Sequence, residues 1–250
     1  MIIRSRANAQ VKRWAKLARD ARLRRAERRV LIEGPHLLAA ALDAGITPLA
    51  LIATEAALAD AEMATLVRRS HVPLSVLSRD AFAAITDVRT PQGIAGEIAL
   101  PQLRREGATL FLEGVQDAGN VGAIVRSAAA FAAGAVILDR GCADPWSPKV
   151  LRAGMGGHFA LQIGQVDTLE MALQSFPGRV LCTVPRGGQS LREADLSGHL
   201  GWLFGAEGAG VSAELQTRAA ARITIPLAKG SESLNVAAAA TVCLYAAFSS

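Results

Sequence analysis

Residues 109–122 read TLFLEGVQDAGNVG, and this stretch decides the fold class. Its first four residues form an uninterrupted apolar run, which predicts a strand that is buried on both faces. A loop with three glycines follows, and the pattern beyond it predicts a helix from about Val121 to Ala133. A buried strand, a short loop and a helix together form the repeating unit of parallel α/β domains.

The same alternation continues to the C-terminus. Strands are predicted at 136–138, 159–163, 180–184, 202–204 and 222–225, and helices at 148–155, 168–175, 213–220 and 234–248. We therefore expect a parallel sheet that is covered by helices on both faces.

The preceding part of the chain predicts a smaller α/β unit. Helices are expected at 8–29, from Pro35 to a glycine cap at Gly45, and at 54–70 and 79–85, with strands at 30–32, 49–53 and 73–77. Residues 86–108 contain the turn sequence TPQG, an extended run at 94–100 and a charged stretch. We place the boundary in this stretch and expect one domain over 1–100 and a second over 107–250.

The composition excludes several classes of protein. Of the 250 residues 51% are hydrophobic and 20% are charged, which rules out a disordered chain. The three cysteines are too few and too scattered for a disulfide framework, and the histidines lack metal-ligand spacing. No apolar run reaches the length of a membrane span, and no apolar signal core follows the N-terminus. We expect a cytoplasmic protein without a metal.

The positive charge is concentrated at the N-terminus. Residues 1–30 hold 11 Lys and Arg against 2 Asp and Glu, whereas the rest of the chain holds 16 against 20. Such a basic arm suits a phosphate backbone, with Trp14 as a possible stacking plane for a base. The alternative is a solvated helical face with ion pairs such as Asp20–Arg24. The excess of positive charge in residues 1–30 favours a nucleic-acid partner over a solvated helical face.

Three loops after predicted strands carry unusual residues, and ligands of parallel sheets bind at the carboxyl ends of strands. In the first loop, residues 113–122, Asn120 is a candidate N-cap of the following helix. The positive end of that helix favours an anion, which Arg126 could also reach. The alternative for this loop alone is a helix cap and a surface arginine.

The second and third loops are residues 204–210 and 225–236. The second has the order G-x-x-G-x-G, so the dinucleotide fingerprint G-x-G-x-x-G is absent, and Glu207 in its middle would repel a pyrophosphate. In the third, Ser233 and Asn235 precede an apolar helix, and Ser233 is a candidate N-cap. Because this helix is apolar nearly all round, we expect it in a core or a subunit interface.

Together and in this order, the loops resemble the three motifs of the SpoU-type, or TrmH-like, RNA ribose methyltransferases of the SPOUT class. The matching residues are Asn120, Gly122 and Arg126 in the first motif, Gly205 and Glu207 in the second, and Ile225, Pro226, Ser233, Leu234, Asn235 and Val236 in the third. Leu227 stands where the family usually has Met, and Lys229 where Gly is common. The segments LIEG at 31–34 and TPQG at 90–93 resemble the RNA substrate-binding domain of that family.

The resemblance implies a particular fold, which the amino-acid composition alone does not indicate. It is a parallel-sheet SPOUT domain with a C-terminal deep trefoil knot, preceded by a small α/β RNA substrate-binding domain. It also implies a homodimer with active sites at the interface, and S-adenosylmethionine bound in the knot. The cofactor-binding residues would be Thr183, Gly205, Ile225, Leu227 and Leu234.

The implied reaction is methylation of a ribose 2′-hydroxyl in structured RNA, with ribosomal RNA favoured over tRNA. The implied catalytic residues are Arg126, Asn120, Glu207, Ser233 and Asn235. Because an arginine is effectively always protonated, we assign Arg126 to clamping a phosphate and stabilising the developing alkoxide, rather than to removing a proton. Another group or water would take the proton.

Four alternatives remain at this stage. The chain could methylate tRNA, or be a non-catalytic RNA-binding protein with the same fold, against which the retained motif residues argue. A Rossmann-type oxidoreductase is disfavoured because its glycine fingerprint is missing. A SPOUT enzyme that methylates a base is disfavoured by the Ser-Leu-Asn motif at 233–235.

Overall fold

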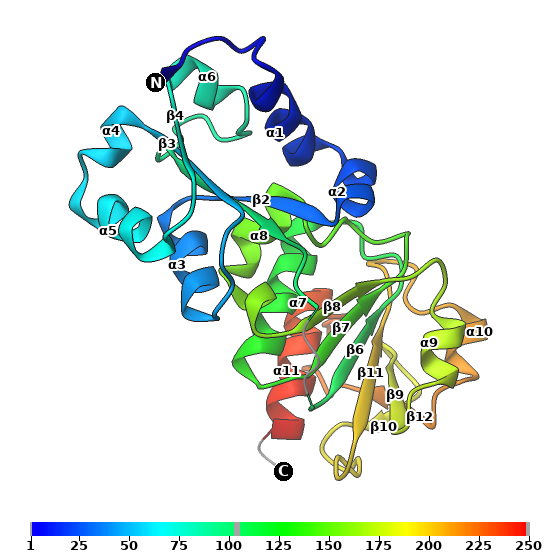
Figure 1. Ribbon diagram of the computed structural model, residues 1–250. Coiled ribbons are helices and arrows are strands. Elements are labelled where there is room, and N and C mark those ends of the chain that lie inside the picture. Colours follow the sequence, from blue (N-terminus) through cyan, green and yellow to red (C-terminus); the bar gives the residue numbers. More distant parts are fainter. Residues whose placement is uncertain (1, 103–105, 249–250) are drawn as a thin grey trace. The chain divides into compact units, whose positions relative to one another are not determined.

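The computed structural model describes residues 2–102 and 106–248 (Figure 1). The chain divides into two compact units, Met1–Pro101 with Trp146–Phe159, and Gln102–Pro145 with Ala160–Ser250. The segment at 146–159 lies inside the range predicted for the second domain, but its contacts belong to the first unit. Among the described residues, no helix is both long and apolar enough to span a bilayer.

The second unit is built on a seven-stranded sheet in the order β10-β12-β9-β11-β6-β7-β8, and its neighbouring strands pair in parallel. The strands are β6 Thr109–Leu112, β7 Ala135–Leu138, β8 Gln162–Gln165, β9 Arg179–Thr183, β10 Gln189–Ser190, β11 Leu200–Phe204 and β12 Ala221–Thr224. The predicted parallel sheet is therefore confirmed. β11 lies between β6 and β9, which precede it in the sequence. Strand order alone does not define threading, so the trefoil knot stays a prediction.

Helices cover both faces of this sheet (Figure 1). They are α7 Ala118–Ala130, α9 Glu170–Gln174, α10 Ala213–Gln216 and α11 Val236–Phe248. On one face, Leu173 of α9 and Leu215 of α10 pack with Phe111, Cys182 and Leu203 of the sheet. On the other face, α11 packs on α7, where the hydroxyls of Ser127 and Thr241 are 2.7 Å apart. The predicted strand at 159–163 is wrong in its start, because residues Gly157–Phe159 form a 3₁₀ turn in the first unit.

The first unit contains a five-stranded mixed sheet in the order β1-β4-β3-β5-β2. Its strands are β1 Ile2–Ile3, β2 Arg29–Glu33, β3 Ala50–Thr54, β4 Leu74–Leu77 and β5 Ile94–Ala99. Its helices are α1 Ala9–Arg19, α2 Ala21–Glu27, α3 Pro35–Asp43, α4 Glu55–Leu58, α5 Ala61–Ser70, α6 Arg79–Ala83 and α8 Pro148–Gly154. The predicted small α/β unit is confirmed, including the start of α3 at Pro35.

Two helices that the sequence predicts as continuous are broken at an aspartate. At Asp20, which separates α1 from α2, the side chain accepts hydrogen bonds from the N–H groups of Arg22 and Leu23. Asp60 separates α4 from α5 in the same way and caps α5. Both aspartates favour a cap over a helix interior, because their side chains compete for backbone N–H groups.

The aromatic side chain of the basic arm is structural. Trp14 is 1% exposed, and its indole N–H donates to Glu97 at 2.8 Å. The prediction that Trp14 offers a stacking plane is therefore wrong. The Arg24 guanidinium is buried as well and donates to the carbonyl of Ala18 at 3.0 Å, so this arginine does not lie on a solvated helical face.

Glu97 in the middle of β5 is the electrostatic centre of this unit. Its side chain is only 4% exposed and accepts hydrogen bonds from Arg13 at 2.9 Å and from Arg29 at 2.8 Å, in addition to Trp14. Burial alone would raise the pKa of this carboxyl, but the hydrogen bonds from Arg13, Arg29 and Trp14 lower it from 4.5 to about 2. Glu97 thus fixes α1 and β2 onto the sheet by means of arm residues.

We expect Glu97→Gln to lower the free energy of unfolding at pH 7 by about 2–4 kcal/mol, because two arginines lose their buried anion. The pKa of Glu97 is lower in the folded state, so its contribution is present above about pH 4.5 and is lost as the pH falls towards 2. Urea denaturation of the wild type and the variant should therefore differ most at pH 7 and converge near pH 2.

Glu27→Gln is the matched control, because Glu27 also contacts Arg13 but its side chain is 28% exposed. We expect this variant to lose less than about 1 kcal/mol. Equal losses in the two variants would contradict the role given to Glu97.

Candidate functional site

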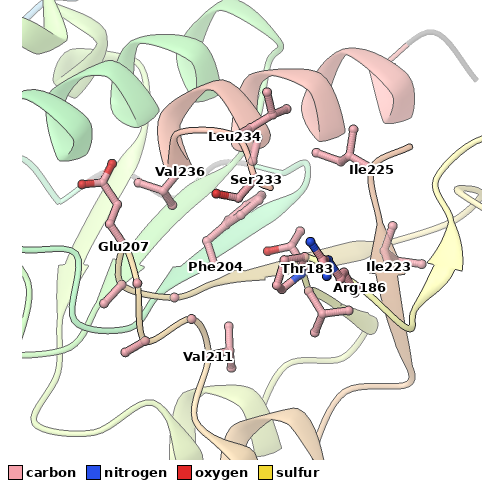
Figure 2. A pocket seen from close by; sticks show the side chains of 18 of the residues that line it. Thr183, Arg186, Phe204, Glu207, Val211, Ile223, Ile225, Ser233, Leu234 and Val236 are labelled. Atoms are coloured by element: carbon pink, nitrogen blue, oxygen red, sulfur yellow. The ribbon is translucent and has the colours of Figure 1, made fainter. Parts of the chain in front are cut away.

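A pocket of about 610 Å³ lies at the carboxyl ends of the strands of the second unit (Figure 2). It is formed by the loops after β9, β11 and β12 and by the start of α11. Because all these strands run in parallel, their following loops meet at one edge of the sheet. The second and third loops of the sequence analysis both line this pocket.

The side chains around the pocket are mostly apolar, with charged groups at its ends. Figure 2 shows Glu207 at one end and Arg186, close to Thr183, at the other. Phe204 forms part of the floor and is 1% exposed, and Val236 at the start of α11 is 8% exposed. An apolar pocket with a few polar groups is typical of a site for a small organic ligand.

The backbone of the second loop is tightly folded beside the pocket. The N–H of Gly210 donates to the carbonyl of Ala206 at 2.8 Å. A Cβ atom on Gly205 would lie only 2.0 Å from the carbonyl carbon of Gly210, so any larger residue would displace backbone here. The glycine at 205 is therefore required by the close approach of two parts of the same loop.

A hydrogen-bonded cluster joins the three loops at one point. The carboxylate of Glu207 accepts from the side-chain amide of Asn120 at 2.8 Å and from that of Asn235 at 2.6 Å. The Asn235 amide also donates to the side-chain oxygen of Asn120 at 3.0 Å. These three residues lie far apart in the sequence, and the structure brings them together as the motifs predict.

The helix caps differ from the predicted ones. Asp117, not Asn120, caps α7, and its side chain accepts from the Asn120 N–H at 3.0 Å. Asn235, not Ser233, caps α11, because its side-chain oxygen accepts from the N–H groups of Ala237 and Ala238. In both asparagines the side-chain amide N–H groups donate within the cluster, and in Asn235 this is compatible with capping because the cap uses the side-chain oxygen.

Of the remaining predicted catalytic residues, Ser233 lines the pocket and Arg126 does not. Arg126 is exposed on α7, six residues beyond Asn120 of the cluster, which corresponds to about 9 Å along the helix axis. Within residues 2–102 and 106–248, its guanidinium makes no hydrogen bond. Arg126 therefore takes no part in the hydrogen bonds of the cluster that its own chain forms.

The five predicted cofactor residues all line the pocket, namely Thr183, Gly205, Ile225, Leu227 and Leu234. The Thr183 hydroxyl donates to the Leu203 carbonyl at 3.1 Å and so joins β9 to β11 beside the pocket. Leu227 and Leu234 remain 37% and 38% exposed, which leaves apolar surface for a ligand to cover.

Sequence reasoning missed two cations at the pocket, Arg186 and Arg222. Arg186 follows β9, and the position of this residue after a predicted strand was the available signal. Arg222 lies within β12, where a strand pattern gives no reason to expect a ligand contact.

The cysteines do not contribute a nucleophile. Cys182 precedes Thr183 in β9, and burial raises the pKa of its thiol to about 11, so it is protonated at neutral pH. Cys142 and Cys243 are buried too, and burial raises the pKa of each thiol to about 12. Among the described residues, no group of three or more His, Cys, Asp or Glu side chains is placed to hold a metal ion.

The fold and the loop cluster define a class of protein, and comparison with known families identifies it. The SpoU rRNA Methylase family matches residues 107–245, and an MRM3-like substrate binding domain matches residues 8–96. The chain therefore belongs to the SpoU rRNA methylase family.

Full-length relatives agree with this assignment. The chain is 34% identical over 249 residues to the 23S rRNA (guanosine(2553)-2′-O)-methyltransferase RlmP of Bacillus subtilis, covering 97% of both chains. It resembles the AdoMet-bound rRNA methyltransferase of Sinorhizobium meliloti with a TM-score of 0.84 and 27% identity, covering 99% of this chain and 97% of that one. The SpoU methyltransferase AviRb of Streptomyces viridochromogenes, at 23% identity and a TM-score of 0.87 with 97% of each chain covered, shares the fold.

Proposed function

We propose that this protein transfers a methyl group from S-adenosylmethionine to a ribose 2′-hydroxyl of ribosomal RNA. The observation that carries the proposal is the cluster of Asn120, Glu207 and Asn235 beside a pocket of about 610 Å³. Family membership and the activity named for the Bacillus subtilis relative support it, and they favour rRNA over tRNA. The three cysteines of this chain are buried and form no disulfide, which is compatible with the reducing cytoplasm, where we propose that the protein acts.

The pocket fits S-adenosylmethionine in size and chemistry. Its volume lies in the range of sites for ligands of this size. Phe204, Ile225 and Leu234 offer apolar contact to the nucleoside, and the tight loop after Gly205 brings backbone polar groups to the wall. When bound, this cofactor supplies an electrophilic methyl group on a sulfonium. Glu207 gives the end of the pocket near the cluster a negative charge that suits a cation.

The residues of this chain would act by position and charge. Glu207 holds Asn120 and Asn235 in fixed orientations, so these two amides form one rigid edge of the site. Ser233 offers a hydroxyl that can orient the ribose. Arg126 clamps the adjacent phosphate and stabilises the alkoxide that develops as water or another group removes the 2′-proton.

A homodimer would account for the position of Arg126. Its own chain leaves it away from the pocket, and the expected homodimer has its active sites at the interface. Helix α11 also presents exposed apolar side chains, with Tyr245 at 62%, Phe248 at 63% and Val242 at 38% exposure. An apolar surface of this kind suits a second copy of the chain. Sedimentation equilibrium tests this: a monomer at micromolar concentration would contradict it.

The direct test of the proposed function uses tritiated S-adenosylmethionine with ribosomal RNA and with tRNA, followed by mapping of ribose methylation. We expect label on a 2′-oxygen of rRNA. Arg126→Ala should lower the transfer rate by about a hundredfold or more, because a donor to the developing charge is lost. Cofactor affinity, measured by calorimetry, should stay close to that of the wild type.

Near-normal turnover of Arg126→Ala would remove Arg126 from the mechanism. Cofactor binding without transfer to any RNA would favour the non-catalytic RNA-binding alternative. Label on a base would favour the base methyltransferase.

Arg186 lies at the end of the pocket opposite Glu207 (Figure 2), where it would face the one carboxylate of S-adenosylmethionine. We expect Arg186→Gln to weaken binding of S-adenosylmethionine by about tenfold, because a charge-assisted hydrogen bond is lost at a partly exposed site. Methylthioadenosine, which lacks the amino-acid part, should bind the wild type and the variant equally in calorimetry.

Arg218→Gln is the matched control, because Arg218 is exposed in the same unit but does not line the pocket. This variant should bind both S-adenosylmethionine and methylthioadenosine with the affinity of the wild type. An equal loss for both ligands in Arg186→Gln would contradict the contact with the carboxylate.

A further inference from the structure

The first unit contains a groove of about 600 Å³ beside α1 and the end of α6. Its lining residues are Arg6, Val11, Lys12, Ala15, Lys16, Arg19, Ala83 and Ala84. Half of them are cationic and none is acidic. We call this feature the basic groove.

The helical period of α1 produces the basic groove. Val11, Trp14, Leu17 and Ala18 form the buried face of α1. Lys12, Lys16 and Arg19 are exposed and follow one another at intervals of four and three residues, so they form a stripe along the helix. The stripe spans about 10 Å at 1.5 Å per residue.

Contacts to backbone hold the two arginines of the basic groove in place. The Nε of Arg6 donates to the carbonyl of Asp80 at 3.0 Å, and the guanidinium of Arg19 donates to the carbonyl of Ala84 at 2.9 Å. A guanidinium has five N–H donors, so each keeps donors for a ligand. Within the part of the chain that the structure describes, Arg6, Lys12, Lys16 and Arg19 form no salt bridge.

The other cations of the arm are in a different situation. Arg13 and Arg29 are paired with Glu97, and Arg24 is buried against backbone carbonyls. The basic arm thus contains cations that hold the fold and cations that line the groove, besides further exposed arginines such as Arg22 and Arg28 that do neither. The groove cations are the ones gathered along a single surface.

We propose that the basic groove binds the phosphate backbone of the RNA substrate. This inference rests on the proposed function and deepens it by assigning a surface to the substrate. A row of cations with no acid among them matches the repeated charges of a nucleic-acid strand, and arginine matches phosphate oxygens in geometry. The floor consists of Val11 and alanines, so it offers no large apolar side chain for insertion into a lipid surface. Such contacts position RNA without reading its sequence.

The test uses two double variants of the full chain. The groove variant carries Lys12→Gln and Lys16→Gln, and the matched control carries Arg22→Gln and Arg28→Gln. Both pairs remove two charges from exposed residues of the arm, but Arg22 and Arg28 do not line the basic groove. The probe is a fluorescently labelled 30-nucleotide RNA hairpin, titrated at several salt concentrations. Vesicles of phosphatidylglycerol serve as the second anionic probe, and S-adenosylhomocysteine binding is measured by calorimetry.

We expect the groove variant to bind the hairpin about tenfold more weakly than the wild type. The slope of log K against log salt should fall by about 1.4–1.8, the effect of losing two phosphate contacts. The control should stay within about twofold of the wild type, and S-adenosylhomocysteine binding should be unchanged in both variants.

An equal loss in the two variants would overturn the inference, because the charge of the whole arm and not the basic groove would then bind RNA. Vesicle binding that is as strong as RNA binding and is lost only in the groove variant would overturn it in favour of a lipid surface. Unchanged RNA binding in the groove variant, with S-adenosylhomocysteine still bound, would overturn this inference alone. Absence of S-adenosylhomocysteine binding in the wild type would instead contradict the proposed function.

Discussion

The carboxylate of Glu207 is the interaction on which the candidate site depends. It accepts hydrogen bonds from Asn120 and Asn235. Asn120 lies 87 residues before Glu207 in the sequence, and Asn235 lies 28 residues after it. The same asparagines belong to the first turns of α7 and α11, so the cluster also fixes where both helices begin. A single acid thereby sets the position of the loops that form one end of the pocket.

The parallel sheet makes this arrangement possible. Strands that run in the same direction deliver all their following loops to one edge, and β11, inserted between β6 and β9, brings Glu207 next to the loop that contains Asn120. The close approach at Gly205 then folds the second loop back on itself. Sheet topology supplies proximity, and the glycine and the carboxylate supply orientation.

The first unit uses charge in two different ways. Glu97 is buried and keeps its negative charge only because Arg13, Arg29 and Trp14 donate to it. This use of arm residues leaves one exposed stripe on α1. The arm therefore contains both cations that stabilise the fold and cations that remain exposed.

Much of the fold could be predicted from the sequence, because apolar runs and helix punctuation are local signals. β6 was predicted with its observed ends, and the three motifs named residues that the structure brings together at Glu207. Some failures were local, such as the helix breaks at Asp20 and Asp60, and others depended on contacts between distant residues. No local pattern shows that Trp14 is buried against Glu97, or that residues 146–159 pack in the first unit.

The caps were mispredicted because neighbouring residues of similar capping ability compete. Asn120 and Ser233 are each acceptable N-caps when read alone, but the structure uses Asp117 for α7 and Asn235 for α11. The pocket cation Arg186 was missed although it follows a predicted strand, because that position alone does not separate a surface arginine from one in a site.

The central claim is that Glu207 couples the first and third loops, and a double-mutant cycle with Asn120→Ala and Asn235→Ala measures this most directly. The free energies of unfolding of the two single variants and the double variant would be determined by urea denaturation, in the wild-type background and with Glu207→Ala. The account predicts a coupling of about 1 kcal/mol between the asparagines that falls by about half or more when Glu207 is removed, because only their direct hydrogen bond then remains. Additive losses in the wild-type background, or a coupling of unchanged size without Glu207, would contradict it.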